Sequence, residues 1–155
     1  MADIKIIVGD IFTQPVDALV NPVNCVGVMG AGLAKQMKQR FPDMYREYRE
    51  LCEDGSLLMG GYSVHAAQYP AIINIPTKYH WKSSADFEMI KESLRAITNA
   101  HNHRFSLLDI HSVAFPLLGC GLGGLKEQDV LPMMVEFLEN SPFERVVIVK
   151  YKKGD

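Results

Sequence analysis

Short apolar runs alternate along this chain with longer stretches in which apolar residues recur every three or four positions. The short runs are rich in Val and Ile and have the length of strands. They predict strands at 4–8, 17–20, 62–66, 71–75, 112–118 and 145–151. The second strand is expected to stop at Asn21-Pro22, and the third and fourth are expected to pair through a short polar turn that ends at Pro70.

The longer stretches have the 3.6-residue period of amphipathic helices. Strands that alternate with such helices predict an α/β sandwich around a mixed, largely parallel central sheet. The predicted helices cover 32–41, 44–54, 87–97 and 130–138, with Ser83 or Ser84 as the expected cap of the third.

Two glycine-rich turns each follow an apolar run and precede a helical stretch. The first, 27–32, reads Gly-Val-Met-Gly-Ala-Gly, and the second, 119–124, reads Gly-Cys-Gly-Leu-Gly-Gly. Glycines let successive backbone N–H groups aim at one point, and a helix N-terminus adds partial positive charge. In an α/β fold, both turns would lie at the carboxyl ends of strands, where ligands bind. The pair predicts a ligand with two phosphates, or one diphosphate held from both sides.

Composition and charge narrow the class of protein. A length of 155 residues fits one domain, 1–155, and the hydrophobic share of 48% is ordinary for a globular protein. The net charge of −2 does not favour nucleic acid, so a DNA contact would need a local basic patch. No apolar run approaches the roughly 20 residues of a membrane span, and no signal peptide is evident. The cysteines and histidines lack metal-ligand spacing, so we expect no metal site. The three cysteines are an odd number and no signal peptide is evident, so we expect reduced thiols and a cytoplasmic location.

Four segments occur in the order typical of macrodomains, and the chain resembles this family over essentially its whole length. They are 9–11, 20–24, 27–34 and 119–124. Within the family, 24–30 (Asn-Cys-Val-Gly-Val-Met-Gly) and 75–81 (Ile-Pro-Thr-Lys-Tyr-His-Trp) are similar to the branch of DarG-type antitoxins and terminal ADP-ribose protein glycohydrolases. The second segment and the 119–125 turn are most similar to the DarG type.

This resemblance implies a three-layer α/β/α sandwich that binds ADP-ribose and removes it from thymidine bases in DNA. It implies no organic cofactor and no metal, with an ADP-ribosyltransferase toxin as a candidate partner. Other functions stay open, because turns that suit an enzyme also suit a reader module that binds ADP-ribose without turnover. Hydrolysis of ADP-ribosylated protein, of O-acetyl-ADP-ribose or of ADP-ribose 1″-phosphate is a further alternative.

The resemblance also implies roles for individual residues. Asp10 would accept a hydrogen bond from the adenine amino group, and the backbone N–H of Ile11 would serve a ring nitrogen. Asn24 would bind the distal ribose, and Tyr151 would pack against the adenine ring. Taken alone, Asp10 is equally a turn former, Asn24 a backbone cap and Tyr151 an exposed tail residue. The diphosphate would be held by the backbone of Val28, Met29, Gly30, Ala31, Gly32, Gly119, Cys120, Gly121, Leu122 and Gly123.

Lys78 matches the lysine that this branch needs for hydrolysis. It would attack the anomeric carbon after losing its proton in an apolar setting near Tyr79 and Trp81, or keep its charge and stabilise the leaving base or a ribose oxygen. Without the resemblance, Lys78 would be taken for a surface lysine. The protein-directed glycohydrolases carry an acidic residue where Gly123 stands here, so a lysine–aspartate route is not supported.

The segment 78–82 interleaves basic and aromatic residues (Lys-Tyr-His-Trp-Lys). This pattern suits single-stranded nucleic acid, whose bases stack on aromatic rings while lysines meet phosphates. A modified base would have to leave the duplex or be unpaired to reach the site. His80 is therefore a candidate DNA contact or general acid–base, with a backbone contact as its structural alternative, and Trp81 is a candidate DNA contact.

Overall fold

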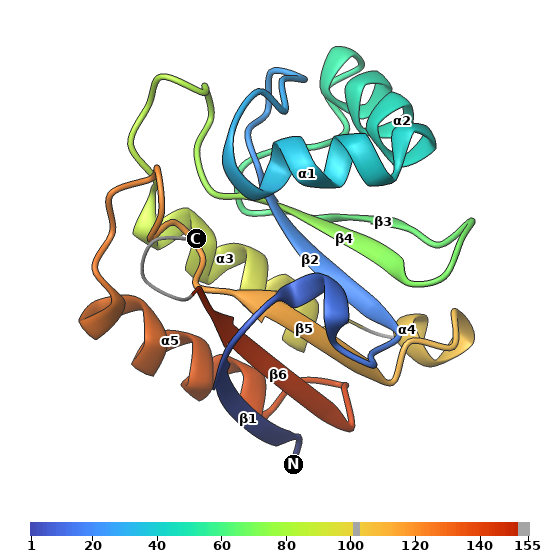
Figure 1. The fold of residues 1–155 in the computed structure, drawn as a ribbon, viewed down its shortest axis with the longest axis vertical. Coiled ribbons are helices and arrows are strands. Elements are labelled where there is room, and N and C mark those ends of the chain that lie inside the picture. The colour runs from blue at the N-terminus through green and yellow to red at the C-terminus, as the bar shows by residue number, and fades with distance from the viewer. Residues whose placement is uncertain (101–102, 152–155) are drawn as a thin grey trace.

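The computed structural model describes residues 1–100 and 103–151, which form a six-stranded sheet between two layers of helices (Figure 1). The strand order is β1-β6-β5-β2-β4-β3. Neighbouring strands are parallel except for β3, which pairs antiparallel with β4 at one edge. The predicted α/β class and largely parallel sheet are therefore confirmed. The strands are β1 (Asp3–Val8), β2 (Ala18–Val23), β3 (Ser63–His65), β4 (Ala71–Pro76), β5 (Ser112–Pro116) and β6 (Arg145–Lys150).

The four predicted helices are present, with bounds that differ by a few residues. Two short elements lacked a sequence signal long enough to show a period, namely the 3-10 helix η1 and the one-turn helix α4. The helical elements are η1 (Ile11–Thr13), α1 (Gly32–Arg40), α2 (Pro42–Glu53), α3 (Phe87–Thr98), α4 (Arg104–Leu107) and α5 (Glu127–Glu139).

Among the predicted boundaries that differ from the structure, three have a clear physical reason. β2 continues through Pro22 to Val23, because its ladder with β5 ends at Leu19 and the missing N–H of Pro22 removes no hydrogen bond on that side. The cap of α3 is Asp86, whose Oδ1 accepts a hydrogen bond from the N–H of Met89 at 3.1 Å, and not Ser83 or Ser84. β5 ends at Pro116, where its pairing with β6 ends, rather than at 118.

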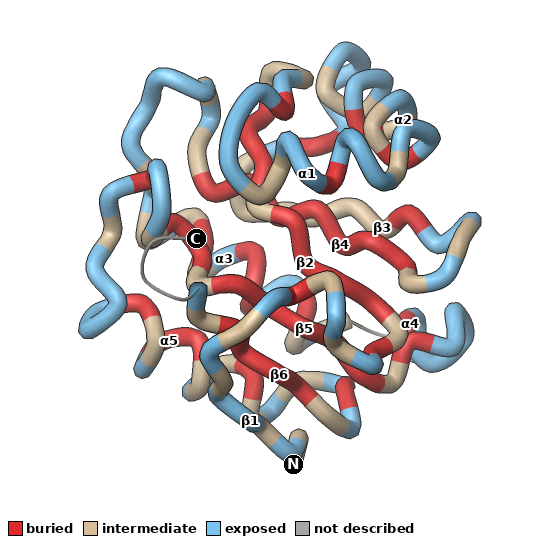
Figure 2. The backbone as a smooth tube through the Cα atoms, viewed as in Figure 1, coloured by how far each residue is buried: buried red, intermediate tan, exposed pale blue. Residues whose placement is uncertain are grey.

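The two faces of the sheet bury separate hydrophobic cores. Alternate residues of the central strands point to opposite faces, so Val20 packs in the core under α3, α4 and α5, whereas Leu19 packs in the core under η1, α1 and α2. Burial is nearly continuous along the four central strands in Figure 2, whereas the edge strand β1, the outer surfaces of helices and the loops are largely exposed. Arg40 of α1 contacts η1 in the layer that also contains α2. Its guanidinium lies 3.9 Å from the centre of the Phe12 ring.

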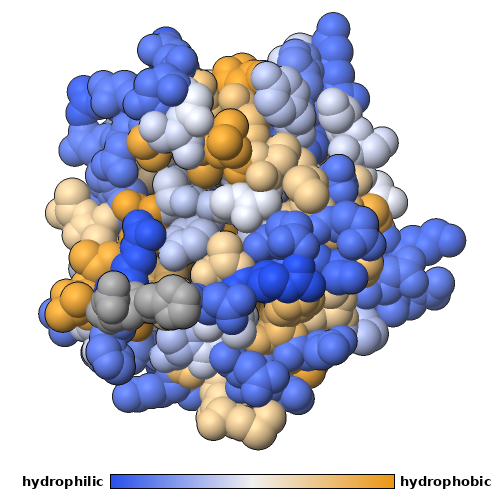
Figure 3. All heavy atoms as spheres, turned by 180° about the vertical axis from the view of Figure 1, so that it is seen from behind, coloured by the Kyte–Doolittle hydropathy of each residue, from blue (hydrophilic) through white to orange (hydrophobic). Residues whose placement is uncertain are grey.

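The reverse face of the molecule interleaves hydrophilic and hydrophobic residues (Figure 3). Within the described residues, no helix combines the length and apolar character needed to cross a membrane.

Candidate functional site

The candidate site lies where the parallel strands end. The loops after β2 and β5, which are neighbours at the centre of the sheet, start at the same edge (Figure 1). The chain leaves β2 toward α1 on one face, whereas it leaves the adjacent β4 and β5 toward α3 and α5 on the other face. Ligands of α/β proteins bind where the direction reverses in this way, outside the carboxyl ends of the strands. Both glycine-rich turns lie at this edge of the sheet.

Free backbone donors gather in these two turns. The N–H groups at 29–31 and 121–123 have no hydrogen-bond acceptor among the residues that the structure describes. Ala31, the N-cap residue of α1, makes no side-chain cap, so the positive end of this helix is also open. Val28 and Cys120 differ, because their N–H groups are used within their own turns, by Asn24 Oδ1 and by the Leu117 carbonyl. Unpaired backbone donors next to a helix N-terminus are the groups that bind anions in proteins.

The second turn packs so tightly that only glycine fits at two of its positions. A Cβ at Gly123 would lie 2.6 Å from the carbonyl oxygen of Gly119 and 2.7 Å from the Ala85 side chain. Gly119 itself has a φ of +77°, and a Cβ there would lie 2.9 Å from Ala85. The backbone of Ala85 also donates to the Gly123 carbonyl at 3.0 Å. An acidic side chain is therefore absent from position 123 and could not be built there without moving the turn.

The two turns approach each other at Leu122 and Gly32. Leu122 is three-quarters exposed, yet its Cδ1 lies 3.6 Å from the position that a Cβ on Gly32 would occupy. The side chain of Leu122 thus bridges from the second turn to the start of α1.

Asn24 lies at the beginning of the loop after β2 and is 6% exposed. Its Nδ2 donates to the carbonyl of Val28 at 2.8 Å, and its Oδ1 accepts from the N–H of Val26 at 3.1 Å. Asn24, which is predicted to bind the distal ribose, therefore also organises its own loop. Its role in binding the ribose stays a prediction. Asn21 is fully buried, and its Nδ2 donates to the Oδ1 of Asn74 at 3.0 Å.

Lys78 is brought beside Asn24 by backbone hydrogen bonds that continue the β2–β4 ladder past the ends of both strands. The N–H of Thr77 donates to the Val23 carbonyl at 2.9 Å, and the N–H of Cys25 donates to the Tyr79 carbonyl at 2.8 Å. Asn24 and Lys78 each lie between these two bonds. Lys78 is half-buried, whereas Tyr79 and Trp81 are 62% and 50% exposed, so the expected apolar enclosure of the amine by these rings is not formed.

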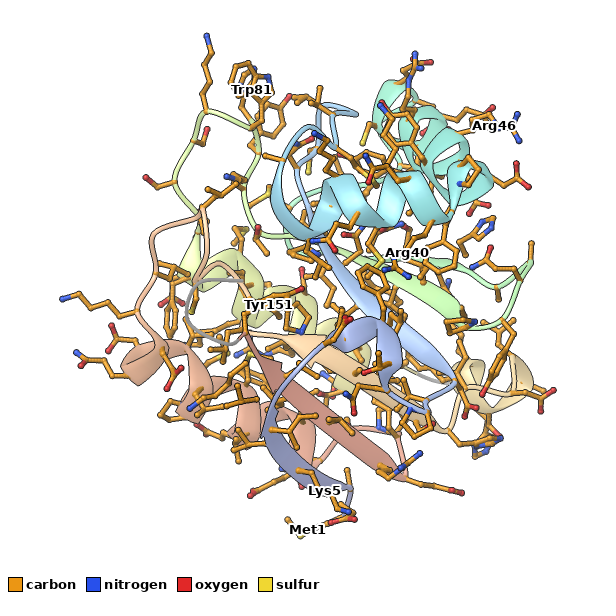
Figure 4. The ribbon with its side chains drawn as sticks, viewed as in Figure 1. Met1, Lys5, Arg40, Arg46, Trp81 and Tyr151 are labelled. Carbon is orange, nitrogen blue, oxygen red and sulfur yellow. The ribbon has the colours of Figure 1, made fainter. Side chains whose placement is uncertain are left out.

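His80 and Trp81 lie in the outer part of the same loop. Their ring centres are 5.3 Å apart, and the Lys82 ammonium lies 5.0 Å from the centre of the Trp81 ring. The Nδ1 of His80 accepts a hydrogen bond from the Lys82 N–H at 3.1 Å, so its backbone partner is an N–H group. This bond leaves Nε2 as the ring atom that can face a ligand. Trp81 extends away from the sheet in Figure 4.

Asp10 and Tyr151 come together from the two ends of the described chain. Asp10 is exposed, and its Oδ1 accepts from the N–H of Phe12 at 2.9 Å, which caps η1. Tyr151 directly follows β6, which ends at Lys150 (Figure 4). The predicted strand, 145–151, was therefore one residue too long. Burial, followed by the charge of the nearby Asp10, raises the pKa of Tyr151 to about 12. The side chain of Ile11 is fully buried in the core.

Cys120 is not set up as a nucleophile. Burial, followed by the carboxylates of Glu127 and Asp129, raises the pKa of its thiol to about 11. A thiol with this pKa is ionised in about one molecule in ten thousand at pH 7. Its side chain packs against the hydrophobic core.

Sequence reasoning missed the aromatic residues that hold the first turn from below. Tyr48 of α2 was taken only as part of an apolar helix face, but its hydroxyl contacts Asn24. Tyr45 donates from its hydroxyl to the Gly27 carbonyl at 3.1 Å. Two tyrosines three residues apart on a helix face were the available signal, because buried phenols need hydrogen-bond partners.

A hollow of about 390 Å³ lies at the opposite end of the sheet, near the amino ends of β2 and β5. Its lining includes Asp17, Tyr69 and Asp109. No group of three His, Cys, Asp or Glu side chains that could hold a metal ion is present within 1–100 and 103–151.

Comparison with known proteins gives the family. The Macro domain model matches residues 20–134. The chain is 39% identical over 140 residues to a DNA ADP-ribosyl glycohydrolase of Thermus aquaticus, a match that covers 88% of this chain and 38% of that protein. A solved macrodomain of Mycobacterium tuberculosis DarG superposes with a TM-score of 0.86 at 36% identity and covers 96% of this chain and 98% of that one.

A third relative combines two activities in its name. It is the DNA ADP-ribosyl transferase–DNA ADP-ribosyl glycohydrolase fusion protein of Thermosipho africanus, 32% identical over 155 residues, which are 88% of this chain and 39% of that protein. Thermosipho africanus DarTG has also been solved with ADP-ribose, with a TM-score of 0.84 at 30% identity over 97% of this chain and 42% of that one. The chain spans about two fifths of the length of the curated relatives it matches.

These observations define a macrodomain, and the chain belongs to the Macro domain family. The resemblance predicted from the sequence is confirmed.

Proposed function

We propose that this chain binds ADP-ribose and hydrolyses its bond to thymidine bases in DNA. The observation that carries the proposal is the position of Lys78, which the Cys25–Tyr79 hydrogen bond fixes next to Asn24 at the edge that holds both glycine-rich turns. A reader module needs the turns but has no need of a lysine at this point. The names of the relatives support DNA as the substrate, and the Thermosipho africanus complex supports ADP-ribose as the ligand.

The binding mode follows from the free donors. The diphosphate would accept hydrogen bonds from the N–H groups at 29–31 and 121–123, with the positive end of α1 behind them. The adenine would lie near Asp10 and Tyr151, and the distal ribose near Asn24 and Lys78. This direction places the scissile bond beside the exposed 78–82 loop.

In the proposed reaction, water adds across the bond between the anomeric carbon and the base. The carbon–base bond breaks, the base takes a proton, and the hydroxyl of water ends on the anomeric carbon of free ADP-ribose. Tyr79 and Trp81 are too exposed to enclose the Lys78 amine, which favours the role in which Lys78 stabilises the electrons that move to the leaving base. The absence of an acidic side chain at Gly123 argues against a lysine–aspartate pair.

An ADP-ribosyltransferase that modifies DNA is the proposed partner. The Thermosipho africanus fusion joins the two activities in one chain, which supports a functional pairing of this kind. The present chain would reverse the modification that such a transferase makes.

The testing experiment measures release of ADP-ribose from a single-stranded oligonucleotide that carries one ADP-ribosylated thymidine. We expect turnover by the wild-type chain, with a higher kcat/KM than for ADP-ribosylated protein, O-acetyl-ADP-ribose or ADP-ribose 1″-phosphate. Tight binding of ADP-ribose without turnover of any substrate would identify a reader instead. Faster turnover of protein or small substrates would overturn the DNA assignment.

Trp81 supplies a test of the single-stranded substrate. Stacking of a base on an aromatic ring contributes roughly 1–3 kcal/mol, so Trp81→Ala should raise the KM for the oligonucleotide about tenfold and leave the Kd for free ADP-ribose unchanged. A matched control is Leu107→Ala, which removes another exposed hydrophobic side chain, in α4. Equal KM values for Trp81→Ala and Leu107→Ala would exclude a stacking role.

A further inference from the structure

The buried hydroxyl of Tyr48 contacts the side chain of Asn24. Tyr48 belongs to α2, is fully buried, and follows Asn24 by 24 residues in the sequence. Its hydroxyl lies 2.7 Å from the Oδ1 of Asn24 and 2.9 Å from the backbone carbonyl of the same residue. Both atoms are acceptors, so the phenol donates to Asn24 in either case.

This contact completes a set of bonds that fixes the direction of the amide. The Oδ1 of Asn24 faces three donors, namely the hydroxyl of Tyr48 and the N–H groups of Val26 at 3.1 Å and Val28 at 3.4 Å. Its Nδ2 donates to the Val28 carbonyl at 2.8 Å. Turning the amide by half a rotation would place Nδ2, a donor, against the two backbone N–H groups, and Oδ1, an acceptor, against the Val28 carbonyl. Only one orientation is therefore stable.

One hydrogen of the amide remains unused. Nδ2 carries two N–H bonds, and a single acceptor for them is found within the described part of the chain. The Oδ1, by contrast, is saturated. Asn24 can therefore offer a ligand a donor but no acceptor.

Tyr48 keeps its proton under working conditions. Burial of the phenol, followed by the neighbouring Cys52, raises the pKa of Tyr48 well above its ordinary value. The hydroxyl therefore keeps a hydrogen that it can donate to Asn24.

We propose that Tyr48 is a positioning residue that fixes the Asn24 amide so that its remaining N–H is donated to an oxygen of the distal ribose. This inference rests on the proposed binding of ADP-ribose, and it adds the residue and the polarity that determine recognition of the distal sugar. Without the phenol, the amide loses its shortest contact and is held less firmly in the orientation that offers its N–H to the ligand.

The same helix offers a matched control. The hydroxyl of Tyr45 also donates to the loop after β2, at the Gly27 carbonyl, but makes no contact with the Asn24 side chain. Tyr45→Phe and Tyr48→Phe each remove one hydroxyl from α2 that supports this loop. Only the second should affect the amide of Asn24.

The test compares the affinities of each variant for ADP-ribose and for ADP, which lacks the distal ribose. Tyr48→Phe should weaken binding of ADP-ribose about tenfold, the effect of a lost hydrogen bond, and change the Kd for ADP less than about twofold. Tyr45→Phe should leave the ratio of the two Kd values unchanged. Equal losses for both ligands in Tyr48→Phe would show a merely structural role and overturn the proposal.

A double-mutant cycle tests the route through Asn24. In an Asn24→Ala background, Tyr48→Phe should have no further effect on the ratio of the two Kd values, because the amide that it orients is gone. A further loss of the ratio in that background would overturn the proposal. If the wild-type chain fails to bind ADP-ribose, both the proposed function and this inference are wrong. If the wild-type chain binds ADP-ribose more tightly than ADP and Tyr48→Phe keeps the same ratio of the two Kd values, only this inference is wrong.

An NMR titration of the wild-type chain tests the donor role of Asn24 without a substitution of Tyr48. The side-chain amide signals of Asn24 in an NMR spectrum should shift on addition of ADP-ribose and stay in place on addition of ADP. Identical shifts with both ligands would contradict the donor role.

Discussion

Replacing Lys78 with alanine is expected to abolish release of ADP-ribose from a thymidine-modified oligonucleotide while the chain still binds free ADP-ribose. Removing a preorganised charge from a reacting bond lowers kcat by about 10²–10³-fold, and a group that acts only in the transition state leaves ground-state binding nearly intact. We therefore expect the Kd for ADP-ribose to stay within about threefold of the wild-type value. Single-turnover release and calorimetric titration measure the two quantities.

Stability should be unaffected, which makes the result easy to interpret. The side chain of Lys78 is half-buried and forms no hydrogen bond or ion pair within the described residues. Lys78→Arg then separates the two chemical roles, since arginine keeps the charge but cannot act as an amine nucleophile. Partial turnover by Lys78→Arg would support electrostatic catalysis. Full turnover by Lys78→Ala would remove this residue from the reaction altogether.

Replacing Gly123 with alanine is expected to destabilise the chain and displace the second turn. The new methyl group would lie 2.6 Å from the Gly119 carbonyl oxygen, a distance that requires the backbone to move. Overpacking of this kind lowers the free energy of unfolding by about 1–3 kcal/mol. In a chain of this size, each kcal/mol lowers Tm by about 2–4 °C. Affinity for ADP-ribose should fall together with stability, because the donors at 121–123 move with the turn.

Gly121→Ala is the matched control for this substitution. A Cβ at Gly121 would have no neighbour within 4 Å, although it belongs to the same turn. We expect Gly121→Ala to keep the wild-type Tm, as measured by thermal unfolding of the three chains. Equal stability of Gly121→Ala and Gly123→Ala would show that the turn adapts without cost and that position 123 can accept a side chain.

Elements with a local period were predictable from the sequence, and elements defined by other parts of the chain were not. The period of 2 or 3.6 residues is set by burial on one face, so the strands and the four longer helices were found. The end of β2 was missed because it depends on where β5 stops pairing, and the cap of α3 depends on which side chain reaches the first turn of the helix. The short elements η1 and α4 contain too few residues to show a period.

The sequence by itself determined the family and the edge of the sheet at which the site lies. Glycine-rich turns that follow strands must gather at one edge when the strands are parallel, so the positions of both turns followed from their order in the chain. The tertiary structure alone decided how the site is held. Lys78 lies beside Asn24 because Cys25 and Tyr79 share a hydrogen bond, Gly123 excludes a side chain because Ala85 packs against it, and Tyr48 reaches Asn24 from α2. These contacts join segments that are 24 to 54 residues apart along the sequence, and no local pattern encodes a contact whose partner is set by the packing of separate elements.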